Sequence, residues 1–207
     1  MVFQRRNPNA PWLVRTMVDI LDNWLMPEDR GIEWGSGRST IWFAERVASL
    51  VSVEHNPDWY RRINSELKAR GLRNVEYHLC EREHEYSSVA NKFSSERFDF
   101  CLVDGEARDH CALAAISLVK PGGIVIVDNC NWYLPTPTYS HSPFSRTLEQ
   151  GPYRGKWAAY LDGVQGWRRI WTSNGVTDTG LWVKPTAVKE ASNPVNQVDE
   201  LSSPNLS

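Results

Sequence analysis

Residues 31–40 read Gly31-Ile32-Glu33-Trp34-Gly35-Ser36-Gly37-Arg38-Ser39-Thr40. A short apolar approach ends in an acid, a tight Gly-Ser-Gly turn follows, and a helix-like run begins at Thr40. The glycines let the backbone turn sharply and let a ligand lie close against it. A helix that starts here would direct its unpaired N–H groups at the same space. The stretch therefore predicts a pocket for a nucleotide-type ligand.

Strands and helices alternate on both sides of this turn. A helical pattern over 11–25 ends at Pro27, and 81–97 is polar with at most a short helix. We expect strands at 31–34, 49–54, 75–79, 98–104 and 124–128, with helices at 39–47, 57–70 and 108–119. This order predicts an α/β fold: a Rossmann-like, doubly wound, mostly parallel sheet with helices on both faces.

The pattern changes after the fifth strand. Residues 131–141 are rich in Pro, Thr, Tyr and Asn and predict a long loop, and 144–161 predicts a helix interrupted by glycine and proline. Two further strands, at 167–172 and 179–183, flank an Asn-Gly turn, so the sheet should end in an antiparallel hairpin. Residues 186–207 are polar without periodicity and predict a disordered tail.

Composition narrows the class of protein. The chain has 207 residues, of which 41% are hydrophobic and 23% charged, which fits one globular domain. A net charge of -2 argues against broad nucleic-acid binding, which depends on Lys and Arg. We expect no signal peptide, no membrane span and a cytoplasmic location, because the start is polar and no long apolar run follows. The four cysteines lack CxxC spacing, so we expect thiols, with two disulfides as the alternative.

Three acids follow predicted parallel strands: Glu33, Glu54 and Asp104. Ligands of such sheets bind at the carboxyl ends of the strands. Glu54 lies 17 residues beyond Gly37, near the spacing at which a carboxylate holds a ribose in dinucleotide folds. Glu54 therefore predicts an adenosine-type ligand, although a solvated acid at a strand end is the alternative.

The remaining residues of the turn select among adenosine cofactors. The dinucleotide fingerprint needs a third glycine where Thr40 stands, and no Gly-Lys-Ser/Thr motif is present. A pyrophosphate would be repelled by Glu33, whereas a cofactor with an amine and a sulfonium would not. S-adenosylmethionine fits best.

Four motifs in order then carry a family resemblance over residues 29–185. The chain resembles the class I S-adenosylmethionine-dependent methyltransferases, of the O-methyltransferase type, in residues 33–37, 53–55, 98–105 and 120–123 and in the closing hairpin. Ser39 replaces the family's usual third glycine. The resemblance implies a methyltransferase domain at 29–185, after an N-terminal helical segment at 1–28 and before the tail. It implies cofactor contacts from Glu33, Gly35, Ser36, Gly37, Ser39, Glu54, His55 and Asp104, with Cys80 and Glu81 flanking the adenine.

Methyl transfer to a hydroxyl needs alignment of the acceptor and removal of a proton. Asp104 is the best placed catalytic acid. Asp104, Asp128 and Asn129 also resemble the magnesium ligands of catechol-type O-methyltransferases, and oxygen ligands suit Mg2+. The alternative is that Asp104 orients the cofactor amine while Asp128 and Asn129 cap the next loop.

Other candidates concern the acceptor. Arg108 could hold an anionic or hydroxylated acceptor, or could pair with Glu106 or Asp109. Possible bases are His110 and His141, and an aromatic acceptor wall would come from Trp132, Tyr133 and Tyr139; most of the ten tryptophans are expected to pack the core.

The leading hypothesis is O-methylation of a small molecule or sugar, with no membrane partner and with the oligomeric state open. The second is a nucleic-acid methyltransferase, which is disfavoured because the fourth strand ends in Val-Asp-Gly. The third is a non-catalytic S-adenosylmethionine-binding module.

Overall fold

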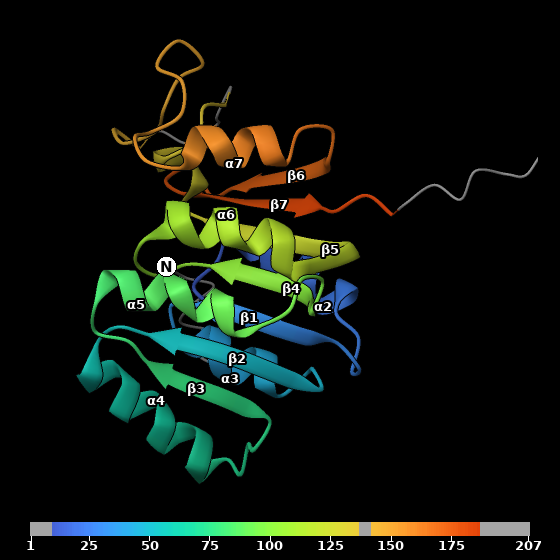
Figure 1. Cartoon of the computed structure of the whole chain (residues 1–207), viewed down its shortest axis with the longest axis vertical. Coiled ribbons are helices and arrows are strands. Elements are labelled where there is room, and N and C mark those ends of the chain that lie inside the picture. Colours follow the sequence, from blue (N-terminus) through green and yellow to red (C-terminus); the bar gives the residue numbers. More distant parts are fainter. Residues whose placement is uncertain (1–9, 137–141, 187–207) are drawn as a thin grey trace, which may run out of the picture.

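The computed structural model describes residues 10–136 and 142–186 (Figure 1). The predicted tail beyond 186 and the candidates Tyr139 and His141 lie outside these residues. The helices are α2 Arg15–Trp24, α3 Arg38–Ala44, α4 Pro57–Ala69, α5 Glu83–Ser88, α6 Arg108–Leu118 and α7 Trp157–Gly163, with 3₁₀ turns η1 Val89–Lys92 and η2 Cys130–Trp132. The strands are β1 Arg30–Trp34, β2 Ser49–Glu54, β3 Val75–Leu79, β4 Phe98–Val103, β5 Val119–Asp128, β6 Arg168–Ser173 and β7 Asp178–Val183.

All seven strands form one sheet in the order β3-β2-β1-β4-β5-β7-β6. β1 to β5 pair in parallel, while β7 pairs antiparallel with both β5 and β6. The order reverses direction between β1 and β4, which is the switch point where such sheets bind ligands. The predicted fold, a doubly wound sheet that ends in an antiparallel hairpin, is confirmed.

The sheet is covered on both faces because its central strands are apolar throughout. Along β4, Cys101 and Val103 pack into one buried cluster with α6 and α7, and Phe100 and Leu102 pack into a second with α2 and α3. Successive side chains of a strand point to opposite faces, so a continuous apolar strand needs a helix layer on each side. Figure 1 shows these helices in front of and behind the sheet.

Two predicted boundaries differ from the structure. The helix expected over 144–161 is wrong: only Trp157–Gly163 is helical, and the residues before it make turns. Gly151 and Gly155 have φ of 62° and 86°, in the left-handed region that a right-handed helix does not use. The strand expected at 124–128 begins earlier, because residues 119–123 also belong to β5, whose pairing with β4 shifts register between Phe98 and Phe100.

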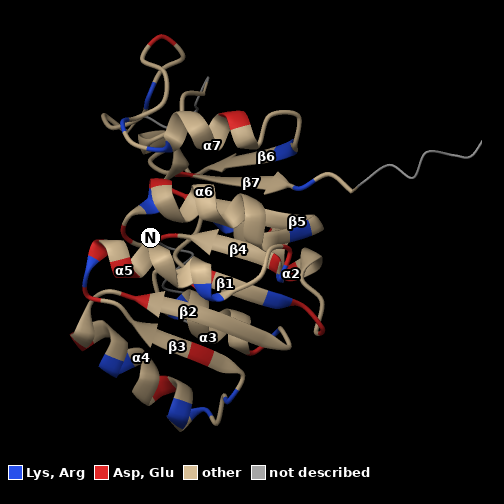
Figure 2. Cartoon of the chain, in the orientation of Figure 1, with Lys and Arg blue, Asp and Glu red and all other residues tan. Residues whose placement is uncertain are grey.

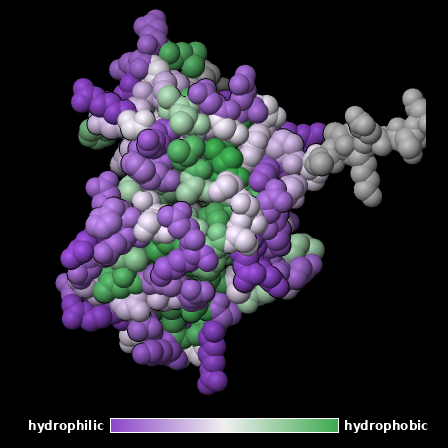
Figure 3. Space-filling view, viewed as in Figure 1, coloured by the Kyte–Doolittle hydropathy of each residue, from purple (hydrophilic) through white to green (hydrophobic). Residues whose placement is uncertain are grey.

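The surface is polar and mixed in charge. In Figure 2, acidic and basic residues are interspersed along the exposed helices, and Figure 3 shows hydrophilic side chains at the margins of this face with hydrophobic ones along its middle. Within 10–136 and 142–186 no helix is both long and apolar enough to cross a membrane. All four cysteines are free thiols, as the spacing predicted.

Candidate functional site

The glycine turn after β1 touches the loop after β4. Gly35 has φ of 102°, and a Cβ added there would lie 2.7 Å from the backbone carbon of Asp104. The Gly35 N–H also donates to the Val53 carbonyl at 2.9 Å, and the Asp104 N–H donates to the Trp34 carbonyl at 2.8 Å. Only glycine satisfies both the φ and the close approach. The carboxyl ends of β1, β2 and β4 are therefore held together at one edge of the sheet.

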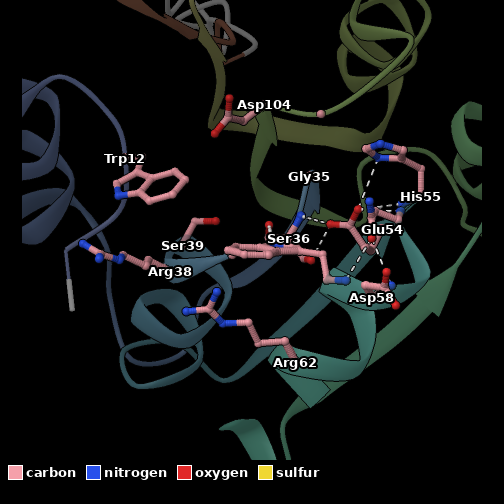
Figure 4. Close-up of a pocket in the computed structure, with 14 residues that line it drawn as sticks. Trp12, Gly35, Ser36, Arg38, Ser39, Glu54, His55, Asp58, Arg62 and Asp104 are labelled. Carbon is pink, nitrogen blue, oxygen red and sulfur yellow. Dashed lines mark hydrogen bonds and ion pairs between the residues drawn. The ribbon is translucent and has the colours of Figure 1, made fainter. Parts of the chain in front are cut away.

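A cavity of about 640 Å³ opens at this edge (Figure 4). This volume lies within the range of small-molecule sites. The cavity lining includes seven of the predicted cofactor residues, while Glu33, Cys80 and Glu81 are not part of it. Its lining consists of Trp12, Gly35, Ser36, Gly37, Arg38, Ser39, Glu54, His55, Asn56, Asp58, Trp59, Arg62, Asp104 and Gly105.

Glu54 is fixed by four hydrogen bonds. Its carboxylate accepts from the Ser36 N–H at 3.1 Å, the Ser36 hydroxyl at 2.5 Å, the His55 N–H at 2.9 Å and the Asn56 N–H at 2.8 Å. The Ser36 hydroxyl also lies 2.6 Å from the hydroxyl of Tyr77. These contacts hold the carboxylate in place without a ligand, and such preorganisation favours binding.

Glu33 lies beneath the turn rather than in the cavity. Its Oε1 accepts from the hydroxyls of Thr40 at 2.5 Å and Ser52 at 2.7 Å, and the Thr40 hydroxyl oxygen accepts from the Gly37 N–H at 2.9 Å. Complete burial raises the pKa of Glu33 to about 7, and the hydrogen bonds from Thr40 and Ser52 offset only part of that rise. Glu33 therefore supports the turn from below, and Cys80 and Glu81 likewise do not line the cavity.

The guanidinium of Arg108 uses all five of its N–H groups on the protein. Nε donates to the Gly105 carbonyl at 2.8 Å, and Nη1 donates to the Asp128 carbonyl at 2.7 Å and to Asn129 Oδ1 at 2.9 Å. Nη2 donates to the Asp104 carbonyl at 2.9 Å and lies 3.1 Å from Asp104 Oδ1. A guanidinium has five donors, so none remains for a ligand. The predicted role of Arg108 as an acceptor clamp does not fit this geometry.

The predicted magnesium ligands lie together, but they do not fit a metal. Arg108 already places a positive charge among Asp104, Asp128 and Asn129, and Asp128 Oδ1 accepts from the Thr179 hydroxyl at 2.5 Å. Over residues 10–136 and 142–186, no group of three or more His, Cys, Asp or Glu could hold a metal ion. A divalent cation here would face the guanidinium at close range, where like charges repel. The expected magnesium site is therefore not supported.

Asp104 stands at the rim of the cavity with its side chain 23% exposed (Figure 4). Burial and the neighbouring charge of Asp128 raise its pKa well above the usual range, and Arg108 opposes that rise. Burial also raises the pKa of Asp128. Two neighbouring carboxyls disfavour ionisation of each other, and a carboxyl with a raised pKa in a cavity is a candidate for acid–base chemistry.

The other predicted acceptor residues lie outside the cavity lining. The His110 ring is half exposed and contacts Asp109 at 3.1 Å. Tyr133 stacks on Trp157 with 4.9 Å between ring centroids, so it packs rather than forms a wall. Trp157 belongs to the buried core, as expected for most tryptophans.

Sequence reasoning missed a group of cavity residues: Trp12, Arg38, Asn56, Asp58, Trp59, Arg62 and Gly105. Only Asn56 carried a readable signal, because Asn before Pro57 is a typical helix cap, and it accepts from the Asp58 and Trp59 N–H groups. Trp12 comes from a segment remote in sequence, and no local pattern could have placed it here.

Comparison with known proteins agrees with this geometry. Residues 32–130 match a family model described as a methyltransferase domain. A search of curated proteins found no match. Solved structures share the fold at low identity: SMU.1697c of Streptococcus mutans in complex with SAH has a TM-score of 0.56 and 11% identity, and covers 80% of this chain and 94% of its own.

Two further structures differ in their described activities. The precorrin-8w decarboxylase of Methanobacterium thermoautotrophicum has a TM-score of 0.54 and 19% identity, and covers 86% of this chain and 95% of its own. A rRNA methylase of Streptococcus thermophilus has a TM-score of 0.53 and 14% identity, and covers 81% of this chain and 93% of its own. At this identity the likeness shows the fold alone. Residues 32–130 therefore form a methyltransferase domain, and the sheet order and the cavity agree with that assignment.

Proposed function

We propose that this methyltransferase transfers the methyl group of S-adenosylmethionine to an oxygen atom of a small molecule. The observation that carries the proposal is the placement of Asp104. Of the three carboxylates in the cavity lining, Glu54 is held in its hydrogen-bond network and Asp58 pairs with Arg61. Asp104 stands at the rim with a raised pKa, and a carboxylate of raised pKa is the stronger base once it is ionised.

The proposed roles combine the family resemblance with the positions of these side chains at the cavity. Glu54 binds the ribose, His55 flanks the adenine, and the Gly35-Ser36-Gly37 turn with Ser39 lines the methionine part. Asp104 accepts the proton of the acceptor hydroxyl while the methyl group moves in line from the sulfonium to the oxygen. No step passes through a metal, because Arg108 already contacts Asp104 Oδ1 and Asn129 Oδ1, which are two of the oxygens that a metal would need.

Two features favour a small molecule over nucleic acid. The cavity has the size of a small-molecule site, and in Figure 2 Lys and Arg alternate with Asp and Glu along the ribbon. The described activities of structurally similar proteins include a rRNA methylase, so RNA is the acceptor class to test against.

The test is methyl transfer from isotopically labelled S-adenosylmethionine to three pools: phenols and sugars, amines, and total RNA. We expect label in the hydroxyl pool, with the product identified by mass spectrometry. Asp104→Asn should lower turnover by about 100-fold, as expected for loss of a general base. Calorimetry should show that this variant still binds S-adenosylhomocysteine. Label in RNA with none in the hydroxyl pool would contradict the proposal.

A further inference from the structure

Four of the cavity residues that take no part in the roles above form a group of their own. The group consists of two indoles and two guanidiniums, from Trp12, Arg38, Trp59 and Arg62, and we call it the Trp–Arg cluster. Trp12 lies before α2, Arg38 starts α3, and the other two lie on α4. In Figure 4, Trp12, Arg38 and Arg62 surround one end of the cavity, away from His55.

Within the cluster, the two indoles lie next to each other and each one contacts a guanidinium. The Trp12 and Trp59 ring centroids are 6.4 Å apart with 32° between the ring planes. Arg38 Cζ lies 5.3 Å from the Trp12 ring, and Arg62 Cζ lies 4.8 Å from the Trp59 ring. Each distance is within the range of a cation–π contact. Each of the two neighbouring indoles therefore has one guanidinium against its ring.

One indole is anchored and the other is free to contact a ligand. Trp59 Nε1 donates to the Ser36 carbonyl at 2.7 Å, which fixes the ring against the glycine turn. Trp12 is 59% exposed, unlike the tryptophans of the core. An exposed indole beside a cavity offers a flat apolar face to a ring-bearing ligand.

The two cations have no carboxylate partner among residues 10–136 and 142–186. Cation–π contacts are the interactions of Arg38 and Arg62 there, and Arg38 Nη1 is buried without a hydrogen-bond partner. The adjacent Arg61, in contrast, pairs with Asp58. A buried charged donor without a partner costs free energy, and an anionic ligand would remove that cost.

We propose that the Trp–Arg cluster binds a carboxylate or phosphate group of the methyl acceptor, with the acceptor ring against the indoles. The inference rests on the proposed function, because it takes the ligand of this end of the cavity to be the acceptor. The guanidinium fork matches the oxygens of a carboxylate or phosphate, and an indole face matches a sugar or aromatic ring. The acceptor is therefore an anionic ring compound.

The cofactor is the rival occupant, because it brings a carboxylate of its own. Measurements on protein saturated with S-adenosylhomocysteine separate the two, since that carboxylate is then already bound. The probes are glucuronate and glucose 6-phosphate against glucose, and benzoate against benzyl alcohol, followed by saturation-transfer NMR. The two sugar anions distinguish a carboxylate from a phosphate, and the neutral partners control for the ring.

We expect at least one anionic probe to bind about tenfold more tightly than its neutral partner, as a charge-assisted hydrogen bond provides. Arg62→Gln and Arg38→Gln should remove that preference, with thermal melting to confirm folding. Arg61→Gln should retain it, because Arg61 lies next in the chain but outside the cavity lining.

Two results would overturn the inference. The first is equal binding of anionic and neutral probes in the saturated protein. The second is anion binding that S-adenosylhomocysteine abolishes, which would assign the cluster to the cofactor. Neither result depends on turnover, so a failure of the proposed O-methylation would be seen separately, in the labelling experiment.

Discussion

Arg108 donates a hydrogen bond from Nη1 to Oδ1 of Asn129 over 2.9 Å. The same guanidinium contacts Asp104 and the Asp128 carbonyl, so a cation that belongs to the chain joins the loops after β4 and β5. The resemblance of Asp104, Asp128 and Asn129 to the metal ligands of catechol-type enzymes predicted a magnesium ion among these residues. Here the side chain supplies the positive charge, at the cost of the open ligand positions that a metal offers to substrate.

Removing Arg108 should create a metal site. Arg108→Ala leaves the oxygens of Asp104, Asp128 and Asn129 without their cation, and such oxygens bind hard cations. We expect the variant to bind Tb3+, seen as sensitised luminescence, and to become more stable to heat when Mn2+ is added. The wild-type protein should show neither effect. The double variant Arg108→Ala with Asp104→Asn should lose both effects. Equal Tb3+ binding by wild type would contradict this interpretation of Arg108.

Activity should rise with pH, because Asp104 must be ionised to accept a proton and its pKa is raised. Arg108 lowers that pKa through its charge, so Arg108→Gln should move the rising limb of the kcat profile to higher pH. Arg108→Lys keeps the charge and should move the limb less. A limb that stays in place in Arg108→Gln would mean that another group titrates.

Gly35→Ala should abolish binding of S-adenosylhomocysteine in calorimetry. The added Cβ would meet the backbone at Asp104, which has no room to shift, and φ of 102° is strained for alanine. Gly71→Ala is the matched control, because Gly71 has φ of 69° and nothing within 4 Å of an added Cβ. The control should lose about 1 kcal/mol of stability from the left-handed backbone and keep cofactor affinity. Similar affinities in the two variants would show that the close approach does not matter.

Glu33 should make the fold less stable as pH rises. Its folded pKa of about 7 exceeds the ordinary value of 4.5, so the folded state holds a proton that the unfolded state has released. The free energy of unfolding therefore falls by about 3 kcal/mol in total as the pH rises from 4.5 to about 7, and the contribution of Glu33 is constant at higher pH. Glu33→Gln mimics the protonated acid and should lack this loss. Urea unfolding at about pH 4 and about pH 8 measures this loss. The same pH dependence in wild type and Glu33→Gln would refute the prediction.

The sequence predicted the sheet well because its signals are local. The bounds of β2 and β3 agree with the prediction to the residue, since each strand is a short β-rich run between clear turn residues. The hairpin was predicted from Asn174-Gly175 for the same reason. The helix expected over 144–161 failed before Trp157 because Gly151, Pro152 and Gly155 make turns there.

The site was predicted in part, and the predictions that failed did so for one physical reason. Sequence placed Glu54 and Asp104 at strand ends, where the structure brings them into one cavity. It did not show that the long side chain of Arg108 folds back onto Asn129, because rotamers are decided by tertiary neighbours. Trp12 and Trp59 meet through packing of remote segments, which no spacing rule encodes.

The bond from Trp59 to the Ser36 carbonyl connects the two halves of the cavity. Ser36 also holds Glu54 through its N–H and its hydroxyl. A ligand that displaces Ser36 at the Glu54 end must therefore move the indole at the other end. Thermodynamic linkage makes such coupling reciprocal, so each occupant alters the affinity of the other. The glycine turn therefore couples the binding of two ligands and also forms the surface beneath one of them.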